Sequence, residues 1–306
     1  MSQSKVIYGE DDRKDISESS LVAIESRLPS KEEKESLEHD IAFARNARAS
    51  TLLINASNII ELPASADGDK SGKKRFKLKK VTFGSVYQLC PDERFYAQPT
   101  AGFCSGIAIA PNFILTAGHC GDTPIESIRF VFDYREAADG TFPDTVLEDK
   151  IFRPVEILKR HYTFTGTDYS VYVLDRDVPW ALRREDLDIG SIIDGSAESI
   201  VKNGRDIYVI GHPSGLPQKV ADGKVIENNS ASHFSTNLDT YQGNSGSGVF
   251  DRETNKLIGL LVRGETDFVY DRKRRCNRSM QCAESTDGCI GEDVHCTSSP
   301  MHPSVL

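Results

Sequence analysis

The sequence predicts an all-β fold, an antiparallel sandwich or barrel, with a short helical segment near the N-terminus. Between residues 81 and 270, short runs rich in β-branched and aromatic residues alternate with Gly, Pro, Asp and Asn. Regularly spaced short strands with turn residues between them are typical of these architectures. The runs are Val81–Leu89, Gly106–Ala110, Phe113–Ala117, Ile128–Phe132, Val171–Leu174, Ile207–Ile210, Gly248–Phe250 and Leu257–Val262.

Three regions follow from these patterns. Residues 1–80 are expected to form an N-terminal extension with a strand at 6–9, a helix near 31–48 and a basic loop. The helix is predicted because apolar residues recur at helical spacing, at Leu37, Ile41 and Ala44. Residues 81–270 form the β-rich domain, and residues 271–306 form a Cys-rich tail.

The basic loop covers residues 67–80 and is dense in lysine. Like charges repel one another, and no apolar face is present to fold the segment, so a solvated loop is expected. A processing or docking segment is the alternative.

Composition limits the classes of function. The 306 residues carry a net charge of −9, so the chain as a whole repels phosphate backbones and no nucleic-acid partner is expected. No window approaches about 18 uninterrupted apolar residues, so no membrane span is predicted.

The cysteines indicate an oxidising compartment. The chain has seven, and four of them crowd the C-terminal tail. Clustered cysteines favour a secreted or periplasmic protein, although the first 30 residues show no apolar signal-peptide segment. An odd number leaves at least one thiol free or bonded to another molecule.

His119 is the first candidate catalytic residue. It directly follows an apolar strand that ends in small residues, which places the imidazole at a barrel edge facing a cleft. A single histidine is more often structural than catalytic. Here Cys104 and Cys120 flank the motif, and a disulfide between them would clamp the loop that aims the imidazole. We therefore predict a Cys104–Cys120 disulfide.

Ser245 is the candidate nucleophile, within Gly243-Asn244-Ser245-Gly246-Ser247. A serine between glycines lies on a tight turn where backbone N–H groups converge. The N–H groups of Gly243 and Ser245 are predicted to form an oxyanion hole, which needs fixed donors where negative charge develops. A Gly-Ser run alone is usually a loop. Its position after the His119 motif in the chain supports its assignment as the nucleophile motif.

Asp168 opens an apolar strand and is the candidate partner of His119. A carboxylate there accepts a hydrogen bond from the imidazole nitrogen that faces away from the nucleophile. Asp175 and Asp177 compete for this role, but both lie at the far end of the strand, where turn carboxylates are common. We favour Asp168.

The order His119, Asp168, Ser245 is the order of chymotrypsin-type enzymes. The sequence resembles the trypsin-like serine peptidases, and in particular the bacterial branch that includes the V8-type glutamyl endopeptidases. The resemblance implies two antiparallel six-stranded β-barrels over residues 81–270, with the active site between them. It is carried by the segments 6–13, 116–120, 168–174, 211–213 and 243–247.

The same resemblance implies where substrate binds. Asp239 stands six residues before Ser245, the position at the base of the specificity pocket in trypsin-like enzymes. An unpaired buried carboxylate there would select Arg or Lys before the cleaved bond. Alternatively, Asp239 caps its loop or is neutralised by Arg263. Gly264 ends the segment that resembles the strand pairing with substrate backbone, and the absence of histidine from 259–264 disfavours glutamate specificity.

Two positions depart from the trypsin pattern. Val262 stands where a serine usually bonds the catalytic aspartate, and Asn244 stands where trypsin has the aspartate that pairs with a newly freed amine. Activation by the trypsin route is therefore in doubt, although Lys5 before Val6 resembles a cleavage junction.

Other candidates for chemistry have simpler interpretations. His212 lies among proline and glycine residues and is expected to be a turn residue. The tail could bind zinc, but the short C-x2–4-C pairs of structural zinc sites are absent, so disulfides of undetermined connectivity are favoured and no metal is predicted. The tail residues concerned are Cys276, Cys282, Cys289, Cys296, His295 and His302.

The sequence thus predicts a serine endopeptidase that acts on proteins or peptides without a cofactor. A catalytically silent homologue acting as a secreted binding protein is the main alternative, and the presence of all three triad residues disfavours it. A protease-chaperone would need a further domain after the last barrel strand, and too little chain follows.

Overall fold

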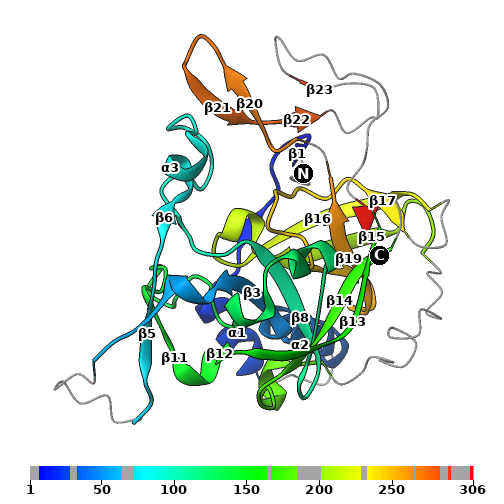
Figure 1. Cartoon of the computed structure of the whole chain (residues 1–306). Coiled ribbons are helices and arrows are strands. Elements are labelled where there is room, and N and C mark those ends of the chain that lie inside the picture. Colours follow the sequence, from blue (N-terminus) through cyan, green and yellow to red (C-terminus); the bar gives the residue numbers. More distant parts are fainter. Residues whose placement is uncertain are drawn as a thin grey trace.

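In the part of the chain that it describes, the computed structural model consists mainly of β-strands with three α-helices, which confirms the predicted fold class (Figure 1). The described residues are 7–27, 33–63, 72–163, 167–184, 201–228, 233–264, 266–282, 289–290 and 304–305. Two seven-stranded sheets dominate the described part of the chain.

The first sheet has the strand order β12-β10-β3-β8-β9-β14-β13, with antiparallel neighbours throughout. Its strands are β3 (Ser50–Asn55), β8 (Cys104–Ala110), β9 (Phe113–Thr116), β10 (Ile128–Val131), β12 (Ile151–Phe152), β13 (Pro154–Tyr162) and β14 (Asp168–Leu174).

Strands β12 and β13 occupy opposite ends of this order, yet only Arg153 separates them along the chain. β12 pairs with β10, and β13 pairs with β14. One almost continuous segment therefore joins both edges of the sheet, so the sheet curls into a barrel.

The second sheet has the order β15-β18-β19-β24-β17-β16-β2, and an additional pairing of β15 with β16 closes it into a ring. β2 pairs with the first two residues of β16, whereas β17 pairs with the last ones. The strands are β2 (Lys14–Asp15), β15 (Asp206–Gly211), β16 (Lys219–Glu227), β17 (Phe234–Thr236), β18 (Gly248–Asp251), β19 (Leu257–Arg263) and β24 (Ser304–Val305).

Four smaller sheets, each of two or three strands, accompany the two barrels in the described residues. They are formed by β4 (Ile59–Glu61), β5 (Arg75–Leu78) and β11 (Thr145–Leu147); by β6 (Val81–Thr82) and β7 (Pro99–Thr100); by β1 (Ile7–Tyr8), β22 (Gln281–Cys282) and β23 (Cys289–Ile290); and by β20 (Phe268–Asp271) and β21 (Cys276–Ser279).

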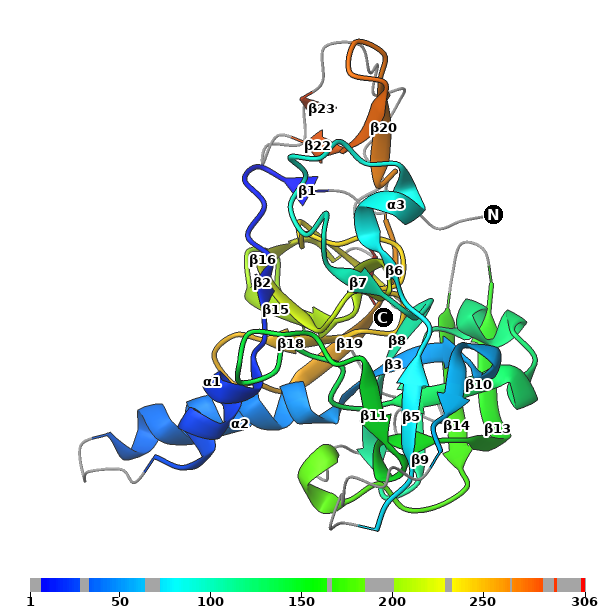
Figure 2. The same cartoon turned by 90° about the vertical axis from the view of Figure 1, so that its left-hand side faces the viewer.

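Two N-terminal helices, α1 (Glu18–Glu25) and α2 (Lys34–Ala49), pack against each other, and Figure 2 shows them below the second barrel and beside the first. α2 is the helix predicted near 31–48, and it buries Leu37, Ala44 and Ala47. α1 was not predicted, because its apolar stretch is short. Ser17 caps its N-terminus, since the Ser17 side chain accepts a hydrogen bond from the Ser20 N–H.

The expected boundary at residue 80 does not separate an extension from the β-rich domain. β3 lies inside the first sheet between β10 and β8, and β2 pairs with the second. The segment 50–55 has little alternation of polar and apolar residues because both of its faces are buried. The predicted basic loop is also partly wrong, since β5 pairs with β4 and β11, while residues 67–71 lie outside the described residues.

The two barrels meet in a shared apolar cluster, beside smaller clusters of their own. The largest buried cluster joins side chains of the first sheet, such as Ile107 and Leu115, to Tyr208, Phe250 and Leu260 of the second. Burial of apolar area contributes about 25 cal/mol per Å², so the barrels are held together by the same interaction that folds each of them. This shared core fixes the relative position of the strands that carry the site.

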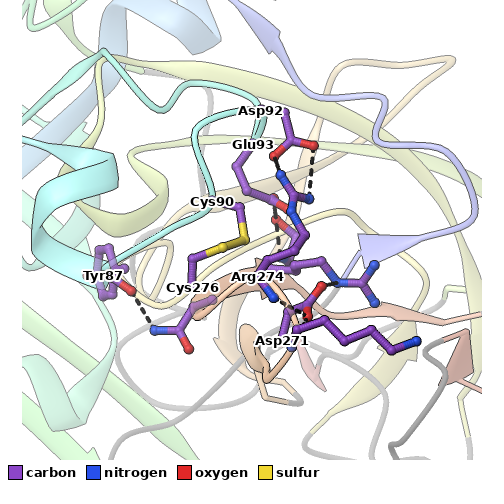
Figure 3. The surroundings of a disulfide bond; sticks show 11 residues. Tyr87, Cys90, Asp92, Glu93, Asp271, Arg274 and Cys276 are labelled. Carbon is purple, nitrogen blue, oxygen red and sulfur yellow. Dashed lines mark hydrogen bonds and ion pairs between the residues drawn. A yellow bond between two sulfur atoms is a disulfide. The ribbon is translucent and has the colours of Figure 1, made fainter.

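A disulfide between Cys90 and Cys276 links the segment after α3 (Phe83–Tyr87) to the hairpin β20–β21 (Figure 3). The sequence left the pairing of both cysteines open. An ion pair between Asp92 and Arg274 lies beside the disulfide. Of the other tail cysteines, Cys282 and Cys289 lie in short strands, and Cys296 lies outside the described residues. No helix in the described part is both long and apolar enough to cross a bilayer.

This disulfide closes a loop of 186 residues, which gives a first prediction. In the chain-entropy model such a loop contributes about 5 kcal/mol of stability, against about 3 kcal/mol for the 16-residue loop closed by Cys104 and Cys120. Cys90→Ser/Cys276→Ser should therefore lower the urea midpoint more than Cys104→Ser/Cys120→Ser does. The fluorescence of Trp180, the single tryptophan, reports unfolding, and the opposite ranking would contradict the prediction.

Candidate active site

His119 lies at the start of a short 3-10 helix, Gly118–Asp122, that directly follows β9. Its backbone N–H donates to Asp168 Oδ1 at 3.0 Å, and its Nδ1 lies 2.9 Å from Asp168 Oδ2. The carboxylate accepts, so Nδ1 carries the proton and Nε2 is left as a proton acceptor. One aspartate thus fixes both the position and the tautomer of the imidazole.

Asp168 is the first residue of β14 and is fully buried. The competing carboxylates lie elsewhere: Asp175 is exposed beyond the far end of β14 and pairs with Arg153 and Arg176, and Asp177 is also exposed. The structure therefore brings Asp168 to His119, as the sequence predicted.

Gly118 has a steric role beside this pair. A Cβ on Gly118 would come within 2.1 Å of the His161 carbonyl oxygen. Any side chain there would push the His119 turn away from β13, and with it the imidazole.

The predicted disulfide between Cys104 and Cys120 is present, with the two Cα atoms 6.3 Å apart. It joins the first residue of β8 to the residue after His119. Cys104, His119 and Cys120 place potential ligand atoms within 4.8 Å of one another. Because both sulfur atoms are in the disulfide, neither offers the thiolate that a metal site would require.

Ser245 lies on a buried turn between β17 and β18. Gly243 and Gly246 have φ values of +86° and +85°, which L residues rarely adopt. A Cβ on Gly246 would lie 2.1 Å from the Ser105 carbonyl oxygen. These two glycines let the turn press against β8, the strand that carries the disulfide of the His119 loop.

Ser105 holds that turn in place. Its N–H donates to the Ser245 carbonyl at 2.8 Å, and its hydroxyl donates to the Gly243 carbonyl at 2.8 Å while accepting from the His212 N–H at 2.9 Å. With both carbonyls of the turn directed to Ser105, the N–H of Gly243 has no hydrogen-bond partner in the part of the chain that the structure describes. Sequence analysis did not single out Ser105.

The sequence model of the trypsin-like peptidase domain matches residues 104–260, just over half of the chain. The chain belongs to the trypsin-like peptidase family. It is a serine endopeptidase of chymotrypsin-like fold. No curated protein sequence matches the chain.

Solved structures with a similar fold include three proteases. A Glu endopeptidase in complex with MPD is 16% identical, with a TM-score of 0.46 over 89% of this chain and 91% of that one. The HtrA-type protease AlgW with a decapeptide is 17% identical, with a TM-score of 0.42 over 79% and 62%. A serine endoprotease from Yersinia pestis is 16% identical, with a TM-score of 0.42 over 78% and 60%. These likenesses are too distant to indicate a substrate.

Asp239 of this peptidase is buried, as expected, but it is not unpaired. Oδ1 accepts from the Tyr8 N–H at 2.7 Å, and Oδ2 accepts from the Asp12 N–H at 2.9 Å. Both carboxylate oxygens therefore anchor the N-terminal segment. The condition on which selection of Arg or Lys depended, a carboxylate free to meet the substrate, is not met.

The N-terminal segment brings a buried charge network to Asp239 and Tyr241, in the segment that leads to Ser245. Arg13 is fully buried, pairs with Asp11, and lies with its guanidinium 3.7 Å from the centre of the Tyr241 ring. Burial raises the pKa of Asp239 to about 8, and nearby Asp12 adds to the shift, while the two backbone donors and Arg13 oppose it.

Three other predicted features have clear positions. Arg263, the suspected neutraliser of Asp239, donates to the Thr163 carbonyl. Gly264 directly follows β19 and is half-buried. His212 is buried with Nδ1 3.0 Å from the Leu216 carbonyl oxygen, and burial lowers its pKa to about 3, so it is a neutral structural residue, as expected. Lys5 and Val6 lie outside the described residues.

The raised pKa of Asp239 predicts a pH-dependent stability. A carboxyl group whose pKa is about 8 when folded and 3.8 when unfolded stabilises the fold fully below pH 4. This stabilisation is lost as the pH rises towards 8. Asp239→Asn removes this titrating group. The Tm of wild type should therefore fall relative to the Tm of the variant as the pH rises from 4 to 8.

The expected change is a few kcal/mol over that window. The variant also loses one acceptor for the Tyr8 or Asp12 N–H, but that loss is constant with pH. A difference in Tm that stays flat from pH 4 to 8 would show that Asp239 does not titrate there.

Proposed function

We propose that this peptidase cleaves proteins or peptides through an acyl-enzyme, with Ser245 as nucleophile, His119 as general base and Asp168 as the residue that positions His119. Ser245 Oγ attacks the peptide carbonyl carbon, and its proton passes to His119 Nε2. The two hydrogen bonds from His119 to Asp168 support this assignment most directly, because they leave Nε2 as the proton acceptor.

The negative charge that develops on the carbonyl oxygen would be stabilised by the N–H groups of Gly243 and Ser245. The tetrahedral intermediate then releases the amine, which takes the proton from His119. Water adds to the acyl-enzyme with His119 again as base, and the acid product leaves Ser245 free. Residues of the chain supply each of these groups, and no cofactor enters the proposal.

The proposed compartment is extracellular or periplasmic. The two disulfides, Cys90–Cys276 and Cys104–Cys120, favour an oxidising environment, since thiols are kept reduced in the cytosol.

The triad predicts a defined effect of Ser245→Ala. The variant should fold normally but lose about 10⁴–10⁶-fold in kcat, and it should no longer react with a fluorophosphonate probe. Ser247→Ala is the matched control, since Ser247 is a buried serine of the same turn whose hydroxyl contacts Asn244 Oδ1. Activity in Ser245→Ala close to that of wild type would disprove the mechanism. A wild type that neither cleaves nor reacts would favour the silent binding protein.

We further propose that the enzyme cleaves after Arg or Lys. Because Asp239 is hydrogen-bonded to the N-terminal segment, we predict that another residue determines this preference. Peptides that differ only in the residue before the cut, Arg, Lys, Glu or Ala, measure the preference. Asp239→Asn should change the Arg-to-Ala ratio of kcat/KM by less than about threefold. If Asp239 were the carboxylate at the base of the specificity pocket, the substitution would lower this ratio by roughly 10²–10³-fold. A change of that size would show that Asp239 contacts the substrate side chain.

A further inference from the structure

The turn of the β20–β21 hairpin carries an unbroken run of exposed cations in a protein whose net charge is −9. Its residues are Arg272, Lys273, Arg274 and Arg275. We propose that this turn, called here the basic tip, binds acidic residues of the polypeptide substrate several positions away from the cleaved bond. The inference rests on the proposed peptidase function.

Two acidic residues beside the basic tip are already engaged. Asp92 accepts from Arg274 in a two-point ion pair, and Asp271 Oδ1 accepts from the N–H groups of Lys273 and Arg274 (Figure 3). Arg272 and Arg275 have no acidic partner among the described residues. Their charges are therefore available to a partner of opposite sign.

The basic tip is held in a fixed position. Cys276, the first residue of β21, is joined to Cys90 by the disulfide. Beside it, the Cys90 N–H donates to the Asn277 carbonyl, and the Asn277 N–H donates to the Gln88 carbonyl, each at 2.9 Å. Asn277 Nδ2 donates to the Tyr87 carbonyl (Figure 3). A preformed surface loses less conformational freedom on binding than a flexible loop does, so more of the charge attraction is realised.

The base of the hairpin adjoins the nucleophile loop. The Gln242 N–H donates to the Asp267 carboxylate at 3.1 Å, and the Phe268 ring lies 4.9 Å from the Tyr241 ring. β20 has four residues, so the tip lies about 13 Å from that base at 3.3 Å per residue. An extended substrate has the same rise, so about four of its residues would span the hairpin if it runs alongside β20. One or two more would span the loop between the base of the hairpin and Ser245, so the proposal takes the contacting residues to be roughly four to six positions from the cleaved bond.

Paired fluorogenic peptides test the proposal. The peptides share one cleaved bond and carry either three Glu or three Gln at positions four to six from it, on one side or on the other. Wild type should cleave one Glu peptide about 3- to 10-fold more efficiently, in kcat/KM, than its Gln counterpart at low salt. This preference should fall towards unity in 0.5 M NaCl, where surface charges are screened.

Arg272→Ser/Arg275→Ser should abolish the preference through KM while leaving cleavage of the Gln peptides unchanged. Arg75→Ser/Lys77→Ser is the matched control, since it removes two exposed charges from β5. The preference should survive in this control.

The outcomes separate failure of this proposal from failure of the proposed function. If Ser245 reacts with fluorophosphonate and both peptides are cleaved equally by wild type, the basic tip does not bind acidic substrate residues. If a duplex oligonucleotide binds wild type but not the hairpin variant, and the Glu preference is absent, the tip is a nucleic-acid site and the proposal is overturned. The same holds if wild type, but not Ser245→Ala, cuts itself within 272–275, because the tip is then a processing site.

Discussion

The assembly of this peptidase depends on one buried residue, Ser105, which connects the two barrels at the turn that carries Ser245. It belongs to β8 of the first sheet, yet its backbone and hydroxyl bind Ser245, Gly243 and His212 of the second half of the chain. A hydrogen bond left unmade in a buried site costs about 1–3 kcal/mol, so these contacts favour a single docking of the turn. The strand that holds the Ser245 turn also begins at Cys104, whose disulfide joins it to the residue after His119.

A second constraint acts from behind the nucleophile loop. In the N-terminal segment, the N–H groups of Tyr8 and Asp12 donate to Asp239, and Arg13 stacks on Tyr241. Asp239 and Tyr241, which precede the Ser245 turn, therefore contact other parts of the protein rather than the substrate. Tyr241 also packs against Phe268 at the base of the hairpin β20–β21. The ordering of the turn is thus coupled to the N-terminal segment on one side and to the disulfide-linked hairpin on the other.

The parts of the site that sequence could predict are those encoded in short motifs. His119, Asp168, Ser245 and the Cys104–Cys120 pair each follow from local patterns and chain order, and the structure brings together His119 and Asp168, and likewise the two cysteines. The environment of Asp239 could not be predicted in this way, because its partners lie more than 220 positions away and donate through backbone N–H groups, which leave no trace in residue type. β3 was missed for a related reason: a strand buried on both faces lacks the alternation that marks a strand.

The long-range contacts of the site have a consequence for biosynthesis. Ser105 meets Gly243 across 138 positions, Tyr8 meets Asp239 across 231, and the Cys90–Cys276 bond spans 186. Pairings between such distant segments form late, because the entropy of closing large loops is lost before the contacts are gained. A nascent chain that has emerged only as far as the first barrel holds His119 and Asp168 but not Ser245, the proposed nucleophile. The proposed triad is therefore complete only after the second barrel has been made and docked.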